Sequence, residues 1–127
     1  MSLVLIVDDE PVTAESLADM ISLLGHKAQV TLSPRTAIQS IQRKAPNLIL
    51  LDLNMPGVDG LEVCRYIKRD PAASDIPVIF ITAEDDPTVI EKAKEAGASG
   101  YMVKPVDFEA LETVLSQAIP SSNGPTP

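Results

Sequence analysis

Five polar side chains follow short apolar runs along the chain: Asp8, Asp9, Asp52, Thr82 and Lys104. The runs cover residues 4–7, 48–51, 78–81 and 101–103, and their length and composition are typical of buried β-strands. Because the carboxyl ends of parallel strands share one edge of a sheet, we expect the five side chains to meet in one pocket. Three carboxylates there would repel each other by roughly 4 kcal/mol per pair at about 4 Å and an effective dielectric constant of about 20. The sequence therefore predicts a cation-binding site.

Segments with helical periodicity separate the apolar runs. Leu17, Ile21 and Leu24, for example, recur at the spacing of one helical face. We expect helices over residues 11–24, 34–44, 60–69, 87–96 and 107–119. We expect strands over residues 4–7, 28–31, 47–51, 77–81 and 101–103.

Five alternations of apolar strand and helix predict a parallel sheet with right-handed crossovers and helices on both faces. The predicted fold class is α/β, a flavodoxin-like (βα)5 doubly wound sheet with strand order 2-1-3-4-5. In that order the crevice lies between the first and third strands, where Asp8, Asp9 and Asp52 would stand. In the last helix, the side chains expected to face the core are Phe108, Leu111, Val114, Leu115 and Ala118.

Length and composition restrict the function classes. With 127 residues and a mass of 13.6 kDa, the chain has room for one domain. A net charge of −8 without a Lys/Arg cluster argues against nucleic-acid binding by this domain. No apolar stretch approaches the roughly 18 residues that cross a bilayer, so we expect no membrane contact and a cytoplasmic location. Cys64 is the only cysteine and is expected to be a small buried side chain.

Four motifs stand where strands are expected to end. They are Val7-Asp8-Asp9-Glu10, the segment from Asp52 to Gly60, Ile81-Thr82-Ala83, and the segment from Gly97 to Pro105. Taken together over residues 3–119, they resemble the receiver domain of bacterial two-component response regulators. The resemblance implies that Asp52 accepts a phosphoryl group from a histidine kinase or a histidine phosphotransfer protein.

The resemblance also implies a requirement for Mg²⁺, which agrees with the predicted acidic cluster. Mg²⁺ in proteins is usually held by one or two carboxylates, waters and a substrate phosphate. The expected ligands are Asp9 and Asp52, with Asp8 binding directly or through water. The resemblance implies the backbone carbonyl of Asn54 as a further ligand. Mn²⁺ could substitute for Mg²⁺.

An acyl phosphate on Asp52 adds negative charge, so hydrogen-bond donors must approach the new oxygens. Lys104 would supply a cation, Thr82 a hydroxyl group, and backbone N–H groups near Ala83 further hydrogen bonds. The resemblance implies a cis peptide bond before Pro105.

The resemblance implies that Thr82 and Tyr101 are switch residues. If Thr82 moves toward the phosphoryl group, the Tyr101 ring can rotate into the vacated space and change the surface of segments 87–96, 101–103 and 107–119. This surface would control an output domain or a downstream protein, or form a homodimer. The alternative is that Tyr101 is a fixed aromatic residue on an edge strand.

Asn54 and Glu84 flank the expected approach of a hydrolytic water. Small polar residues there leave water access, so we expect the phosphoryl group to be lost comparatively quickly by self-dephosphorylation. No turnover of an external substrate is expected. His26, the only histidine, is expected to be a solvated turn residue rather than a phosphate carrier.

Ordinary structural roles are also open to several of these residues. Taken singly, Asp9 could cap a helix, Thr82 could cap its own turn, and Asp59 with Gly60 could form a tight turn. One rival function is a Mg²⁺-dependent aspartyl phosphatase or phosphotransferase, which the adjacency of Asp8 and Asp9 and the lack of a cap domain disfavour. A flavin-binding electron carrier is weaker, and a degenerate receiver that only binds proteins should lack one of the five pocket residues.

The chain is expected to consist of a receiver domain over residues 1–119 and a Pro/Ser/Gly-rich linker or tail over residues 120–127. This composition favours an N-terminal receiver of a longer regulator. A stand-alone receiver with a short tail is the alternative.

Overall fold

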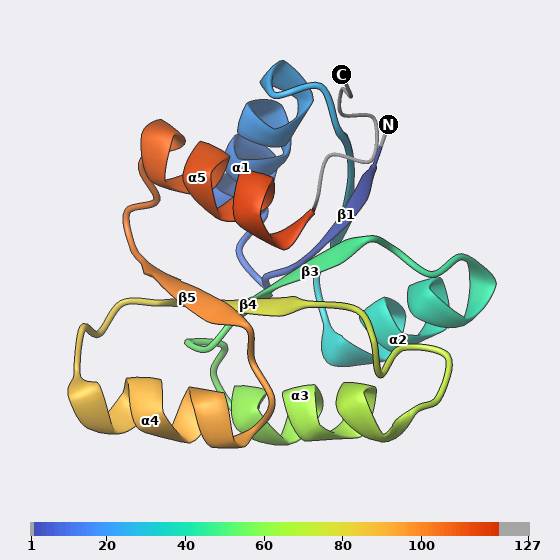
Figure 1. Ribbon diagram of the computed structural model, residues 1–127, viewed down its shortest axis with the longest axis vertical. Coiled ribbons are helices and arrows are strands. Elements are labelled where there is room, and N and C mark those ends of the chain that lie inside the picture. Colours follow the sequence, from blue (N-terminus) through green and yellow to red (C-terminus); the bar gives the residue numbers. More distant parts are fainter. Residues whose placement is uncertain (1, 120–127) are drawn as a thin grey trace.

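Strands and helices alternate along residues 2–119, the part of the chain that the computed structural model describes (Figure 1). The strands are β1 (Leu3–Val7), β2 (Lys27–Thr31), β3 (Leu48–Asp52), β4 (Val78–Thr82) and β5 (Gly100–Val103). The helices are α1 (Pro11–Leu23), α2 (Pro34–Arg43), α3 (Gly60–Arg69), α4 (Pro87–Glu95) and α5 (Phe108–Ala118). The segment 120–127, expected to be a linker or tail, lies outside the described residues.

The five strands form one parallel sheet in the order β2-β1-β3-β4-β5, which confirms the predicted flavodoxin-like fold. The register brings the carboxyl ends of neighbouring strands level. Val7 lies opposite Leu51, and Thr82 lies opposite Val103. Residues that end or follow these strands are therefore neighbours at one edge of the sheet.

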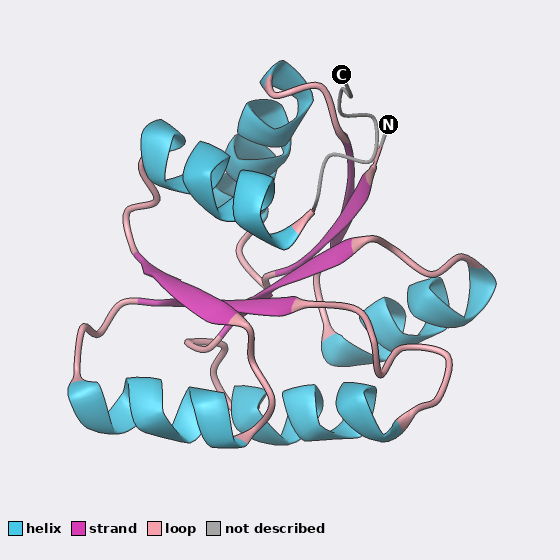
Figure 2. Ribbon diagram, in the orientation of Figure 1, coloured by secondary structure: helices cyan, strands magenta, loops and turns pink. Residues whose placement is uncertain are grey.

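Helices cover the sheet on both faces (Figure 2). α1 and α5 pack on one face, whereas α2, α3 and α4 pack on the other. Alternate strand residues supply the two cores, and all five residues of β3 and of β4 are buried. Burial of one Leu or Ile side chain stabilises a fold by about 1.5–3 kcal/mol. The central strands β3 and β4 are therefore firmly anchored, and their ends are fixed positions.

Helix starts follow from local capping. The N-cap side chains that accept a backbone N–H are Ser33, Asp59, Asp86 and Asp107. α1 is different, because its N-cap is Glu10 without a side-chain cap bond. Asp9 is thus not the cap of α1, and a capping role does not account for this carboxylate.

Three expectations need correction or refinement. Asp52 and Thr82 are the last residues of β3 and β4 rather than the residues after them, because the sheet pairing continues one position further. Phe108 is not part of the core: it is 39% exposed at the first position of α5. His26 follows the turn after α1 but is half-buried, and its Nδ1 is buried without a hydrogen-bond partner among residues 2–119.

Two other expectations can be compared directly with the structure. Cys64 lies on the buried face of α3 and is fully buried in the core, as predicted. Within residues 2–119, none of the helices has the length and apolar character that crossing a membrane requires.

The two phenylalanines give a matched test of this core. Phe80 is fully buried on β4, so Phe80→Ala should lower the free energy of unfolding by about 3–5 kcal/mol. The same substitution at the exposed Phe108 should cost less than about 1 kcal/mol. Urea denaturation of both variants measures the difference, and equal losses would contradict the assigned burial.

Candidate functional site

Three carboxylates gather at the edge of the sheet where β1 and β3 end. Asp8, Asp9 and Asp52 each place one carboxylate oxygen within 4.8 Å of the other two. Asp8 is 1% exposed and Asp52 is 2% exposed, whereas Asp9 is open to solvent. Burying a carboxylate is costly unless hydrogen bonds or opposite charges compensate it, so the partners of Asp8 and Asp52 decide what this cluster can do.

Asp52 is held by two donors on one oxygen. Its Oδ1 accepts the backbone N–H of Asn54 at 2.9 Å and lies 3.0 Å from the Lys104 ammonium group. Lys104 reaches the cluster from the chain after β5, where its backbone N–H donates to the Thr82 carbonyl at 2.8 Å. The peptide bond between Lys104 and Pro105 is cis. Lys104 thus brings the positive charge of this site from the strand most distant in sequence.

Asp8 is less well compensated than Asp52. Its Oδ1 accepts the Glu10 N–H at 3.0 Å, but its Oδ2 is buried without a hydrogen-bond partner among residues 2–119. Burial raises the pKa of Asp8 to about 6, and the Asp52 charge adds to this shift. The Glu10 N–H and the Lys104 charge lower the pKa only in part. A buried carboxylate oxygen without a donor, beside two further carboxylates, fits a hard divalent cation with oxygen ligands.

Further hydrogen bonds lie in the turns that follow β3 and β4. Thr82 is 1% exposed, and its Oγ1 accepts the Glu84 N–H at 3.1 Å, so it does cap its own turn. Asn54 is exposed, and its Oδ1 accepts the Ala83 N–H at 2.7 Å. The Thr82 hydroxyl, the Asn54 amide oxygen and the Ala83 N–H, which are the groups expected to act at Asp52, are therefore already hydrogen-bonded.

A family model for the response regulator receiver domain matches residues 4–116. This span includes all four motifs and every residue of the acidic cluster. The chain belongs to the response regulator receiver family. Its acidic pocket of Asp8, Asp9 and Asp52 is consistent with phosphoryl acceptance in two-component signalling. A receiver is a phosphoacceptor signalling module rather than a turnover enzyme, so the rival phosphatase is set aside.

Curated relatives of this receiver differ in length. Protein PilH of Pseudomonas aeruginosa is 34% identical over 119 residues, with 94% of this chain and 98% of that protein covered. The transcriptional regulatory protein AfsQ1 of Streptomyces coelicolor is 37% identical over 112 residues, with 87% of this chain but only 48% of that protein covered. The receiver therefore spans almost all of one relative and about half of another.

A solved structure adds a comparison for the metal site. The receiver domain of the sensor histidine kinase PA1611 from Pseudomonas aeruginosa has a TM-score of 0.84 and 27% identity, over 93% of this chain and 97% of that one. In that structure a magnesium ion is coordinated in the active-site cleft. The acidic cluster of the present receiver is typical of such a site.

The remaining expected residues lie around this cluster rather than in it. Tyr101 is on β5 and is 38% exposed, and Glu84 is exposed on the loop after β4.

Thr31, which ends β2 and is buried, supports the cluster but was not among the residues predicted from sequence. Its carbonyl accepts the Asp8 N–H at 3.1 Å and its Oγ1 donates to the Ile6 carbonyl at 2.8 Å. β2 has the sequence KAQVT, in which polar and apolar residues are mixed, so the sequence offered no clear signal for this support of Asp8.

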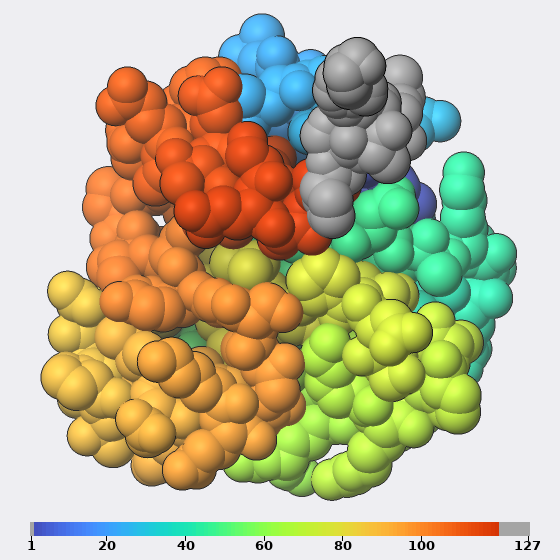
Figure 3. Space-filling model, in the orientation of Figure 1, coloured from blue at the N-terminus to red at the C-terminus, as the bar shows by residue number. Residues whose placement is uncertain are grey.

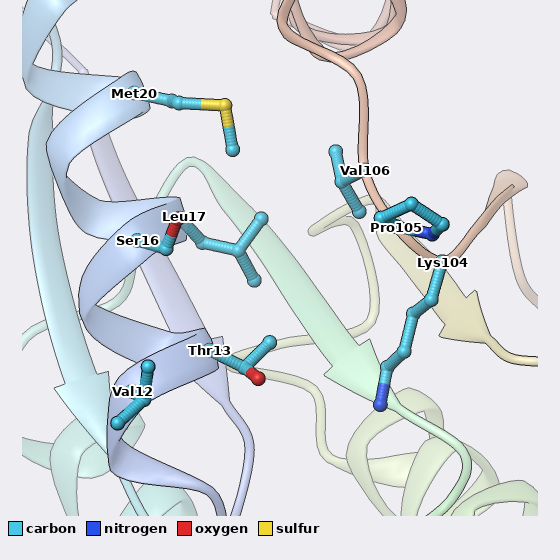
Figure 4. A pocket seen from close by; sticks show the side chains of 8 residues that line it. All are labelled: Val12, Thr13, Ser16, Leu17, Met20, Lys104, Pro105 and Val106. Atoms are coloured by element: carbon cyan, nitrogen blue, oxygen red, sulfur yellow. The ribbon is translucent and has the colours of Figure 1, made fainter.

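A hollow of about 500 Å³ adjoins the cluster between α1 and the chain after β5 (Figure 4). It is lined mainly by apolar side chains, and Val106 faces Leu17 and Met20 across the opening. Val12 at the start of α1 is 80% exposed, and Lys104 extends past the hollow toward the end of β3. The charged site thus has an apolar neighbour that is open to solvent.

The pKa of Asp8 predicts a specific pH dependence of stability without divalent ions. Because the folded value of about 6 exceeds the unfolded value of about 3.9, the folded state binds more protons between these pH values. Stability should therefore fall as pH rises through this window. Asp8→Asn should be more stable than the wild type at pH 7.5 by on the order of 2 kcal/mol, with little difference at pH 4.

Urea denaturation in EDTA at several pH values measures this effect. Asp75→Asn, an exposed residue outside the cluster, is the control and should show no such pH-dependent gain. A destabilised Asp8→Asn protein at pH 7.5 would contradict the assigned burial of an uncompensated charge.

Proposed function

We propose that Asp52 of this receiver accepts a phosphoryl group from the phosphohistidine of a histidine kinase or a histidine phosphotransfer protein. One observation carries the proposal: the Asp52 carboxylate is 2% exposed, lies within 4.8 Å of the Asp8 and Asp9 carboxylates, and lies 3.0 Å from Lys104. These neighbours hold the buried carboxylate in a fixed position, which favours its attack on phosphorus. Because the carboxylate is already an anion, it needs no general base.

In the transfer, a bond forms between an Asp52 carboxylate oxygen and phosphorus while the bond from phosphorus to the partner's histidine nitrogen breaks. The nitrogen keeps the bonding electron pair. The Lys104 ammonium, the Thr82 hydroxyl and the Ala83 N–H then donate to the phosphoryl oxygens. This chain therefore contributes positioning and charge compensation, which are the main demands of phosphoryl transfer.

The proposed metal ligands are carboxylate oxygens of Asp8, Asp9 and Asp52 with the backbone carbonyl of Asn54. The unpartnered Oδ2 of Asp8 supports this assignment, because a buried anionic oxygen needs a positive neighbour. Bound Mg²⁺, or Mn²⁺ in its place, supplies charge neutralisation for the approach of an anionic phosphoryl group to these acids.

We propose that the partner also covers the hollow beside Lys104. A phosphohistidine must reach the buried Asp52 from the open edge of the sheet, and the hollow with Val12 is the apolar surface next to that edge. Apolar contact there would fix the orientation of the partner, while the charged cluster performs the transfer.

For the output, we propose a surface made of α4, β5 and α5. These elements lie on one face of the molecule (Figure 3). Tyr101 is half-exposed within this face, and Thr82 precedes the loop that leads to α4. Movement of Thr82 toward a phosphoryl group, followed by inward rotation of Tyr101, would change the face that an output domain, a downstream protein or a second receiver contacts.

The domain division is part of this proposal: residues 1–119 are the receiver and residues 120–127 are a linker or tail. An output domain beyond it would match relatives of the AfsQ1 type, of which the receiver covers about half. A stand-alone receiver would match PilH.

Incubation with acetyl phosphate and Mg²⁺ tests the acceptor residue directly. Intact mass should show one added phosphoryl group on the wild type, none on Asp52→Asn, and none on either protein in EDTA. Asp59→Asn, on the exposed N-cap of α3, is the matched control and should be phosphorylated like the wild type. Phosphorylation of Asp52→Asn to the wild-type level would overturn the assignment of Asp52.

The exposure of Asn54 and Glu84 predicts a short phosphoryl lifetime. After removal of acetyl phosphate, the native protein with Mg²⁺ at neutral pH should lose its phosphoryl group quickly and should not retain it for hours. The same phosphoprotein unfolded in urea is the control and should lose the label more slowly, because no residues then orient a water. Retention for hours by the native protein would refute the roles of Asn54 and Glu84.

A further inference from the structure

The loops after β3 and β4 are joined by one hydrogen bond across the functional edge of the sheet. The Ala83 N–H donates to the Asn54 side-chain oxygen Oδ1 at 2.7 Å, between residues 29 positions apart. The backbone N–H of the same Asn54 donates to Asp52 Oδ1 at 2.9 Å. One residue thus touches the acceptor carboxylate with its backbone and the neighbouring loop with its side chain.

This bond competes with the donor role of Ala83 in phosphoryl binding. A backbone N–H has one hydrogen, so it cannot make two short, well-aligned bonds at once. In the structure that hydrogen is already taken by a neutral amide oxygen. A phosphoryl oxygen on Asp52 can use the Ala83 N–H only after the Asn54 side chain has left it.

We propose that the Asn54 side chain is a positioning group that holds the Ala83 N–H in the unphosphorylated receiver and yields it to a phosphoryl oxygen on Asp52. The inference rests on the proposed function. Exchange is favourable, because an anionic oxygen is a much stronger acceptor than a neutral amide oxygen. The displaced amide of Asn54 loses little, because this residue is exposed and water can replace its partner.

The exchange has two consequences for the site. Before phosphorylation the two loops are tied together, and afterwards Ala83 is bonded to the phosphoryl group instead. Ala83 lies three residues before Asp86, whose side chain caps α4, so the change occurs close to the start of that helix. The released Asn54 amide is also free to orient a water beside the phosphoryl group. The Asn54 side chain would thereby hold the loop after β4 in the unphosphorylated receiver and favour hydrolysis of the phosphoryl group in the phosphorylated one.

Nuclear magnetic resonance can observe this exchange directly. A scalar coupling across the hydrogen bond, between the Asn54 side-chain carbonyl carbon and the Ala83 amide nitrogen, should be present in the Mg²⁺-loaded, unphosphorylated protein. It should disappear on saturation with fluoroberyllate, a phosphoryl mimic, while the Ala83 amide stays protected from hydrogen exchange. A coupling that persists in the fluoroberyllate complex would overturn the inference.

Variants separate this role from a general effect on loop structure. Asn54→Ala should lose protection of the Ala83 amide in the unphosphorylated state, and Asn54→Asp, which keeps an acceptor oxygen, should retain it. Asp59→Ala removes another side-chain acceptor from the same loop and should leave the Ala83 amide unchanged. Asn54→Ala should also be phosphorylated by acetyl phosphate about two- to twelvefold faster, the factor that corresponds to the net energy of one ordinary hydrogen bond.

Unchanged protection of Ala83 in Asn54→Ala would refute the inference as clearly as a persistent coupling. Intact mass distinguishes this failure from failure of the proposed function. If Asp52 is phosphorylated and the coupling persists, only the role of the Asn54 side chain is wrong. If Asp52 accepts no phosphoryl group, the proposed function and the inference fail together.

Discussion

Repulsion between buried carboxylates is the constraint on which this receiver is built. Asp8 and Asp52 are nearly inaccessible and share a cluster with Asp9, yet the main protein cation beside them is Lys104, 3.0 Å from Asp52. The opposite charge and the Asn54 N–H compensate Asp52, whereas one oxygen of Asp8 has no donor among residues 2–119. The fold therefore maintains an excess of negative charge at a fixed place, and that excess creates the demand for a divalent cation and for donors to an incoming phosphoryl group.

The sheet makes such an arrangement possible because its central strands are anchored on both faces. All residues of β3 and β4 are buried, so the backbones of Asp52 and Thr82 have little freedom to move apart, and a response of Thr82 is a movement of its side chain. The groups around them sit on loops whose side chains are mostly exposed. A rigid acceptor surrounded by adaptable donors suits a site where the charge to be bound changes from a carboxylate to a phosphoryl group.

The strand–helix alternation, the strand order and the clustering of Asp8, Asp9 and Asp52 could be predicted from sequence, because continuous apolar runs require a sheet covered on both sides. The side-chain exposure of Phe108 could not, since helical periodicity shows which residues share a face but not which of them a neighbouring element covers. The Asn54–Ala83 bond was also beyond sequence reasoning, because it joins two loops whose relative placement depends on the packed sheet. His26 was misjudged for a related reason, since a turn residue can still be covered by its neighbours.

The position of Lys104 has a consequence for biosynthesis. A ribosome delivers both buried acids of the pocket, at positions 8 and 52, well before it adds the lysine that follows β5. A nascent chain that ends before residue 104 has the acids of this pocket without their ammonium group. Electrostatic completion of the receiver thus coincides with arrival of the last strand, and a prematurely terminated product would lack a balanced acceptor.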